Sequence, residues 1–105
     1  KIEMYDLAMV IGVLIHIAPK YLPLAYENIY RATRRYILIG EYYSRQPEEV
    51  SYRGYKNKLF KRDFAGEMLD KYTDLRLVDY GFFYHKDESS NLDDITWFLM
   101  EKADI

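Results

Sequence analysis

The stretch YDLAMVIGVLIHI at residues 5–17 decides how the rest of this sequence is interpreted. It contains an apolar run over residues 7–11, and Gly12 closes that run. A short apolar run without alternation is typical of a parallel strand that is covered on both faces. The apolar part of the stretch is too short to cross a bilayer. We therefore expect a buried parallel strand at residues 7–11, followed by a turn at Gly12.

The next segment predicts a helix and a second buried strand. Between residues 20 and 33, apolar side chains recur at steps of three and four residues, which draws one apolar stripe along a helix. A second strand covers residues 36–43: it begins with the apolar run YILIG and ends on a glutamate and two tyrosines. Strand, helix and strand in this length form a βαβ unit, which is right-handed in nearly all proteins.

The second half of the sequence predicts one more helix and a terminal hairpin. Residues 44–58 are polar and contain a proline and a glycine, so we expect an irregular loop, which at this length is usually functional or disordered. A helix follows at residues 61–72, and a short polar turn joins strands at residues 75–85 and 94–102. The predicted fold class is α/β, in the order β-α-β-α-β-β, with a C-terminal antiparallel hairpin on an otherwise parallel sheet.

The composition narrows the classes of partner. The chain has 105 residues, a net charge of −2 and no cysteine. The near-neutral charge offers no footprint for nucleic acid or an anionic membrane, although the 12 tyrosines could stack on bases. The absence of cysteine excludes disulfides and thiolate catalysis, and it is consistent with a cytoplasmic protein. Two histidines and scattered carboxylates show no metal-ligand spacing, so we expect no metal.

The order of elements and several stretches resemble the second half of a class I S-adenosylmethionine (SAM)-dependent methyltransferase. Residues 5–17 are similar to the family's fourth strand with its G-V-L-x-H-I turn. Residues 36–43 are similar to the fifth strand, and the terminal hairpin to the reversed last strand. Four further stretches resemble the methylases associated with pseudaminic acid biosynthesis, namely YRG at 52–54, LFKRDFAGE at 59–67, LRLVDYGF at 75–82 and DITWF at 94–98.

The resemblance implies a doubly wound, Rossmann-like sheet, SAM as the cofactor and a small polar, sugar-related methyl acceptor. In that family a glycine-rich loop and an acidic residue of the first half hold the cofactor. The five glycines of this chain are isolated from one another. We therefore expect residues 1–105 to be one partial methyltransferase domain, a fragment without the N-terminal glycine-rich half, which on its own binds SAM weakly or not at all.

Ligands of open α/β sheets lie at the carboxyl ends of the strands, and this rule selects the site residues together with the resemblance. Ile11, Gly12 and Val13 would contact the methionine part of SAM; the alternative is that Gly12 only permits a tight turn. His16 would lie near the methyl donor or acceptor; the alternative is a hydrogen bond to the first turn of the next helix. Glu41 would accept a proton from the acceptor or position it; the alternative is a solvated carboxylate.

Substrate contacts are expected from Tyr42 and Tyr43 at the end of the second strand, and from Tyr52 and Arg53 in the long loop. Tyrosine and arginine together suit a sugar ring, a phosphate or a carboxylate. The alternatives are tyrosines that only support the structure and a loop that is merely solvated.

Two functions remain open. The first is methyl transfer from SAM to an oxygen or nitrogen by the complete enzyme, in an in-line displacement. The second is a non-catalytic, oligomerising α/β module, because the strand at residues 7–11 would leave an open apolar edge that pairs with another chain. In either case we expect a homodimer or higher oligomer through this edge.

Overall fold

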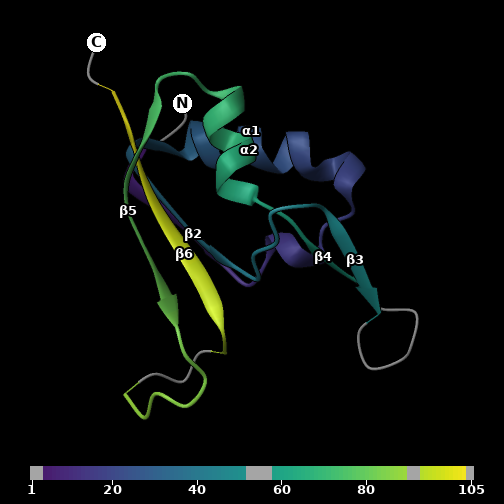
Figure 1. Ribbon diagram of the computed structural model, residues 1–105. Coiled ribbons are helices and arrows are strands. Elements are labelled where there is room, and N and C mark those ends of the chain that lie inside the picture. Colours follow the sequence, from purple (N-terminus) through teal and green to yellow (C-terminus); the bar gives the residue numbers. More distant parts are fainter. Residues whose placement is uncertain (1–3, 52–57, 90–92, 104–105) are drawn as a thin grey trace.

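The computed structural model describes residues 4–51, 58–89 and 93–103 (Figure 1). The chain forms two helices, two short 3-10 turns and six strands within these residues. In chain order they are β1 (Tyr5–Ile11), η1 (Leu14–His16), η2 (Pro19–Tyr21), α1 (Leu22–Ala32), β2 (Thr33–Glu41), β3 (Glu48–Ser51), β4 (Lys58–Lys61), α2 (Phe64–Lys71), β5 (Leu75–Phe83) and β6 (Ile95–Lys102).

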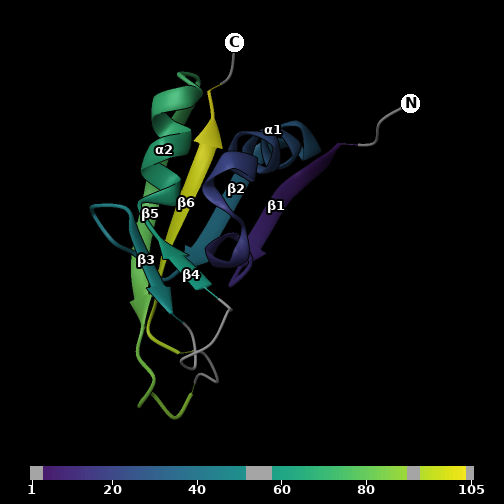
Figure 2. The same ribbon diagram turned by 90° about the vertical axis from the view of Figure 1, so that its right-hand side faces the viewer.

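The main sheet has four strands in the order β1-β2-β6-β5 (Figure 2). Strands β1 and β2 are parallel, which confirms the expected βαβ unit around α1. Strand β6 lies between β2 and β5 and is antiparallel to both, so β1, β2 and β5 all point the same way. The expected terminal hairpin is therefore present. The fold is mixed α/β, with a second sheet of two antiparallel strands, β3 and β4.

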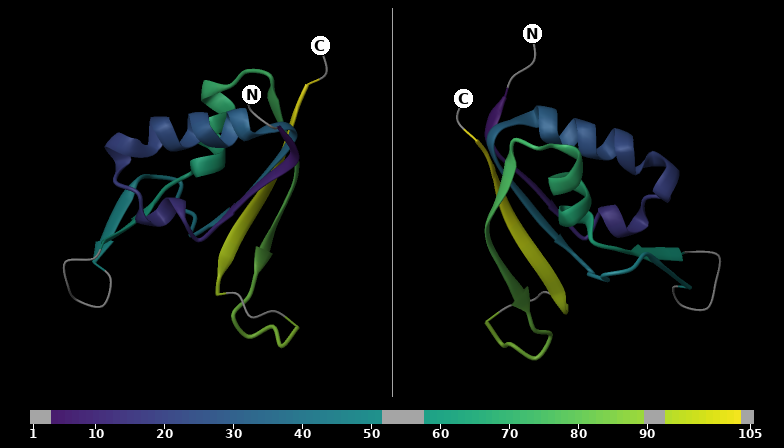
Figure 3. Two further views of the ribbon diagram at one scale, coloured as in Figure 1. Left: turned by 180° about the vertical axis from the view of Figure 1, so that it is seen from behind. Right: turned by 45° about the horizontal axis from the view of Figure 1, so that its top comes forward.

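Both helices lie on the same face of the main sheet (Figure 3). Ile37 and Ile39 of β2 and Met100 of β6 are at most 1 % exposed and form the floor of the core. Leu22 of α1 and Met68 of α2 pack onto this floor. Each helix begins where the sequence permits: Pro23 occupies the first turn of α1, where no N–H is needed, and the Asp63 carboxylate caps α2 by accepting the N–H of Gly66.

The opposite face of the sheet carries no helix among the residues that the structure describes. Leu7 and Met9 of β1 are 46 % and 60 % exposed there. The Trp97 ring lies flat across Gly81 of the neighbouring strand, since a Cβ at Gly81 would come within 2.6 Å of it. A doubly wound sheet has helices on both faces, so the described chain supplies the cover of one face only.

The segment between β2 and α2 differs from the sequence-based expectation of an irregular loop. Glu48–Ser51 pairs with Lys58–Lys61 in an antiparallel hairpin, with Val50 opposite Leu59. Leu59 is 6 % exposed and belongs to the main core, and β4 packs against η1. This long-range packing stabilises two strands of only four residues each. Among the described helices, none is long and apolar enough to cross a membrane.

Candidate functional site

The turn after β1 lies at the carboxyl end of the parallel pair of strands. Gly12 has a φ of +69°, in the left-handed region that favours glycine, and its N–H donates to the Gly40 carbonyl at 2.8 Å. A Cβ at Gly12 would meet no atom within 4 Å, so the backbone conformation, and not crowding, requires glycine here. Ile11 is half-buried and Val13 is 51 % exposed, so the outer side of the turn is open.

Glu41, the last residue of β2, lies beneath this turn. Its side chain is buried, with the residue only 3 % exposed. Oε2 accepts the N–H groups of Val13 and Leu14 at 3.1 and 3.2 Å, and Oε1 accepts that of Ile15 at 3.2 Å. The expectation of a solvated carboxylate as the alternative role is therefore wrong. Burial raises the pKa of Glu41 above its ordinary value, and the backbone N–H groups that bond to the carboxylate oppose that rise.

A small notch on the helix-covered face adjoins Glu41. Tyr43, Arg62 and Phe98 line it together with the first residues of α2. Nε of Arg62 is bonded to Glu67 at 2.6 Å, and Glu67 in turn accepts the hydroxyl of Tyr26 at 2.7 Å. The Arg62 guanidinium near the carboxyl end of β2 is thus held by an ion pair with α2, and the Tyr26 hydroxyl links the same glutamate to α1.

His16 is the last residue of η1 and is exposed. Its backbone N–H closes the turn by donating to the Val13 carbonyl at 3.1 Å. The structure therefore brings His16, Val13 and Glu41 into one short region, with the imidazole on the solvent side and the carboxylate on the buried side.

Tyr42 and Tyr43 follow β2 and point to different neighbours. The Tyr42 hydroxyl donates to Asp93 at 2.6 Å, and Nζ of Lys61 lies 5.5 Å from the centre of the Tyr42 ring. Tyr43 is 44 % exposed, and its ring centre lies 6.0 Å from that of Phe98. Tyr52 and Arg53, the two other predicted substrate contacts, lie outside the described residues. The sequence had given no signal for Asp93, because its partner lies 51 positions away.

A hollow of about 220 Å³ opens between η2 and the β3–β4 hairpin. Its apolar walls are Pro19, Pro47 and Phe60, and charges of both signs line it, from Glu48 and Glu49 and from Lys61 and Arg62. Such a mixed lining suits a small polar molecule better than an apolar one. The hollow lies on the same side of the molecule as η1, since β4 packs against that turn.

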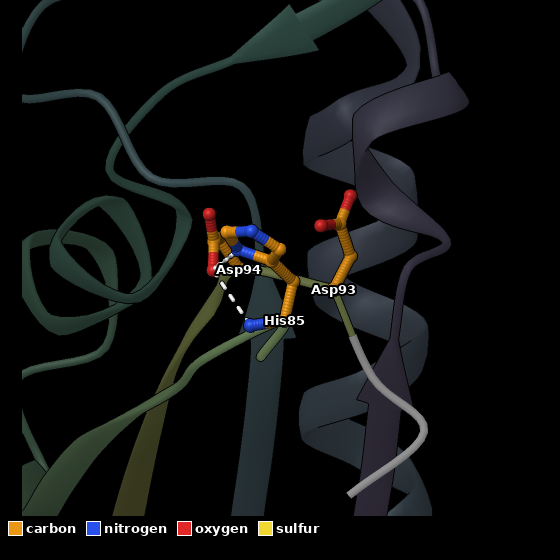
Figure 4. A group of neighbouring side chains, drawn as sticks. All are labelled: His85, Asp93 and Asp94. Atoms are coloured by element: carbon orange, nitrogen blue, oxygen red, sulfur yellow. Dashed lines mark hydrogen bonds and ion pairs between the residues drawn. The ribbon is translucent and has the colours of Figure 1, made fainter. Parts of the chain in front are cut away.

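His85, Asp93 and Asp94 gather where the β5–β6 hairpin opens (Figure 4). One ligand-type atom from each lies within 4.8 Å of the others. Oδ1 of Asp94 accepts the backbone N–H of His85 and lies 2.9 Å from its Nδ1, while Asp93 accepts the Tyr42 hydroxyl. These hydrogen bonds hold the pKa of each aspartate below its usual range. These hydrogen bonds link the end of β5 to the start of β6, and link both to Tyr42, which follows β2.

Comparison with protein-family models and with curated proteins finds no match for this sequence.

Proposed function

We propose that this chain is part of a SAM-dependent methyltransferase that modifies a small polar, sugar-related acceptor in the cytoplasm. One observation carries the proposal: a parallel βαβ unit, whose first strand ends on a glycine turn, belongs to a sheet whose last strand alone is reversed. This is the arrangement that the resemblance of residues 5–17 and of the terminal hairpin implies for the second half of such an enzyme.

The turn after β1 fits the methionine end of SAM. Open space lies beside Gly12, and Val13 is half exposed, so a ligand can approach the backbone there closely. When bound, SAM would supply an electrophilic methyl group on a sulfonium. The sequence offers no glycine-rich loop for the rest of the cofactor, so the proposed site is complete only with a further glycine-rich unit along β1.

Different residues of this chain would then position the cofactor-binding turn and the methyl acceptor. Glu41 holds the turn from below, and both of its oxygens are occupied by backbone N–H groups. Tyr43, with its exposed ring, and the charged hollow beneath the β3–β4 hairpin would orient the acceptor. Transfer from a sulfonium depends mainly on in-line orientation, so a strong base is not required.

Calorimetry with SAM tests this function on the complete gene product. We expect the complete protein to bind SAM and this chain alone to bind it weakly or not at all. A Val13→Arg substitution in the complete protein should weaken binding, because it blocks the turn. Leu24→Arg is the matched control: Leu24 is 61 % exposed on α1, and its replacement should change nothing. A complete protein that does not bind SAM would refute the proposal.

The alternative is a non-catalytic module that assembles with copies of itself. Strand β1 is at the edge of the sheet, and Leu7 and Met9 on it are exposed, which favours pairing with another chain. Light scattering at micromolar concentration should give a dimer or larger. Met9→Lys should lower the mass toward that of a monomer, and Leu24→Lys should not. A monomeric wild-type chain would count against this function.

A further inference from the structure

Four successive backbone N–H groups of the turn after β1 point into the protein. Gly12 donates to the carbonyl of Gly40, and the next three residues donate to the carboxylate of Glu41. Backbone N–H groups that converge on one point normally form an anion site. Here a side chain of the protein itself occupies that point, so these N–H groups are not available to a phosphate or a carboxylate of a ligand.

The outer side of the same turn is exposed, with Val13 at 51 % and open space beside Gly12. Glu41 is 3 % exposed and has each oxygen bonded to the backbone, so it cannot reach a proton on a substrate. Its effect on anything bound outside must pass through the backbone of Val13, Leu14 and Ile15.

The side chains around Glu41 do not take over the role of these backbone contacts. Tyr43 and Arg62 line the adjoining notch, and Thr96 faces it from β6. Nε of Arg62 is bonded to Glu67, and no ion pair joins Glu41 to any residue within the described ranges. Within the described residues, the hydrogen bonds that Glu41 accepts all come from the backbone of the turn.

We propose that Glu41 is a positioning residue: its carboxylate acts as an internal anion that fixes the β1–η1 turn with its N–H groups inward. A ligand outside then meets the exposed backbone of Gly12 and the exposed Val13, in one preset conformation. The inference rests on the proposed function, because it assumes that this turn is a ligand-contacting surface. It replaces the role of Glu41 as a proton acceptor.

Amide hydrogen exchange measured by NMR on this chain tests the inference. Removing the carboxylate in Glu41→Ala leaves three N–H groups without partners, two buried and that of Val13 partly buried, so exchange at residues 13–15 should quicken by roughly tenfold to a hundredfold. Glu41→Gln keeps one acceptor oxygen but turns an amide donor toward the same N–H groups, so its effect should be intermediate. The matched control is Glu101→Ala, which removes a carboxylate of β6 bonded to Arg35 and Arg76.

Chemical rescue separates positioning from general support of the fold. Sodium formate fits the space left in Glu41→Ala and should restore slow exchange at residues 13–15, whereas sodium chloride at equal ionic strength should not. Formate should leave these residues unchanged in the wild type and in Glu101→Ala. Equal quickening throughout the chain, or no rescue, would overturn the inference. If Glu41→Ala does not fold, Glu41→Gln with unchanged exchange at residues 13–15 would overturn it as well.

A second measurement, of SAM binding, distinguishes a failure of this inference from a failure of the proposed function. In the complete protein, Glu41→Gln should raise the Kd for SAM by about tenfold, matching one lost backbone hydrogen bond in the turn. A wild-type complete protein that fails to bind SAM would refute the methyltransferase function, while formate rescue of the turn would still stand. SAM binding that is unaffected by Glu41→Gln would refute the positioning role alone.

Discussion

A charged side chain lies at each end of β2, and each satisfies backbone groups of the helical segment beside it. At the carboxyl end, Glu41 accepts the N–H groups of residues 13–15. At the amino end, Nζ of Lys102 donates to the carbonyls of Tyr30 and Thr33 at 2.7 and 2.5 Å. Glu41 accepts the backbone N–H groups at the start of a turn, and Lys102 donates to the carbonyl groups at the end of α1.

The two charges differ in what surrounds them. Lys102 lies 3.9 Å from the centre of the Tyr30 ring, and the attraction of Asp74 opposes the loss of hydration that lowers its pKa. Glu41 has only backbone N–H groups to oppose the effect of burial, and it lies beneath an exposed turn. The difference indicates that Lys102 stabilises the packed junction between α1 and β2, whereas Glu41 fixes the conformation of an exposed turn.

The largest effect should come from removing Glu41. Glu41→Ala leaves three backbone N–H groups of the turn unpaired, two of them buried, and we expect it to lower the free energy of unfolding by about 1–3 kcal/mol. Urea unfolding followed by circular dichroism measures this. A loss no larger than that of an exposed substitution such as Glu88→Ala would mean that water satisfies these groups and that the turn does not depend on Glu41.

Removing Lys102 should cost less. Lys102→Met keeps most of the apolar stem and deletes the hydrogen bonds to two carbonyls at the end of α1, so we expect a loss of about 1 kcal/mol. Lys102→Met leaves two carbonyl groups without this donor, whereas Glu41→Ala leaves three N–H groups without an acceptor. If Lys102→Met proves more damaging than Glu41→Ala in the same urea titration, our assignment of the two roles should be exchanged.

How much of this comparison was predictable from the sequence depends on the range of the contacts. The two apolar runs at residues 7–11 and 36–40 predict strands, because such composition demands cover, and both strands are found. The expected burial on both faces is wrong for the first strand within the described residues, since Leu7 and Met9 are 46 % and 60 % exposed. The helix-stripe spacing likewise predicts α1, and the helix expected at residues 61–72 is found as α2, although it begins three residues later, at Phe64. The residues that produce these signals are neighbours in the chain, so the sequence alone reveals them.

The contacts of Glu41 were not predictable in the same way. A glutamate after a buried strand usually reaches water, and its N–H partners lie 26 to 28 positions earlier. The β3–β4 hairpin was missed for a related reason, since Leu59 is buried against η1 and not by its neighbours in the chain. Tyr42 could be placed at a strand end, but its bond to Asp93 depends on the hairpin that carries Asp93.

The two charges should also give stability opposite dependences on pH. Burial raises the pKa of Glu41 above 4.5, so just above that pH the native protein binds more protons than the unfolded chain. The part of the stability that depends on protonation of Glu41 is therefore full below pH 4.5 and is lost as the pH rises through its native pKa. Lys102 has its pKa lowered from 10.5, so the part of the stability that depends on its deprotonation is full above pH 10.5 and is lost as the pH falls through its native pKa.

Urea titrations from pH 4 to 7 on the wild type and on Glu41→Gln isolate the first of these terms. The stability difference, wild type minus variant, should fall as the pH rises, because only the wild type carries the titrating group. A difference that grows with pH would mean that the three N–H groups outweigh burial and that the pKa of Glu41 lies below its ordinary value.

The smallest effect should come from an ion pair that lacks any buried backbone partner. Arg34 and Asp6 meet at 2.7 Å across β2 and β1, but their side chains are 65 % and 76 % exposed. Exposed pairs of this kind contribute little, so Arg34→Ala should change the free energy of unfolding by less than about 0.5 kcal/mol, and less still at high salt. A loss comparable with that of Glu41→Ala would show that charge pairing itself, and not the satisfaction of buried backbone groups, governs stability at the edge of this sheet. The expected order, Glu41 before Lys102 before Arg34, follows instead from how many backbone groups each side chain serves and how far those groups lie from water.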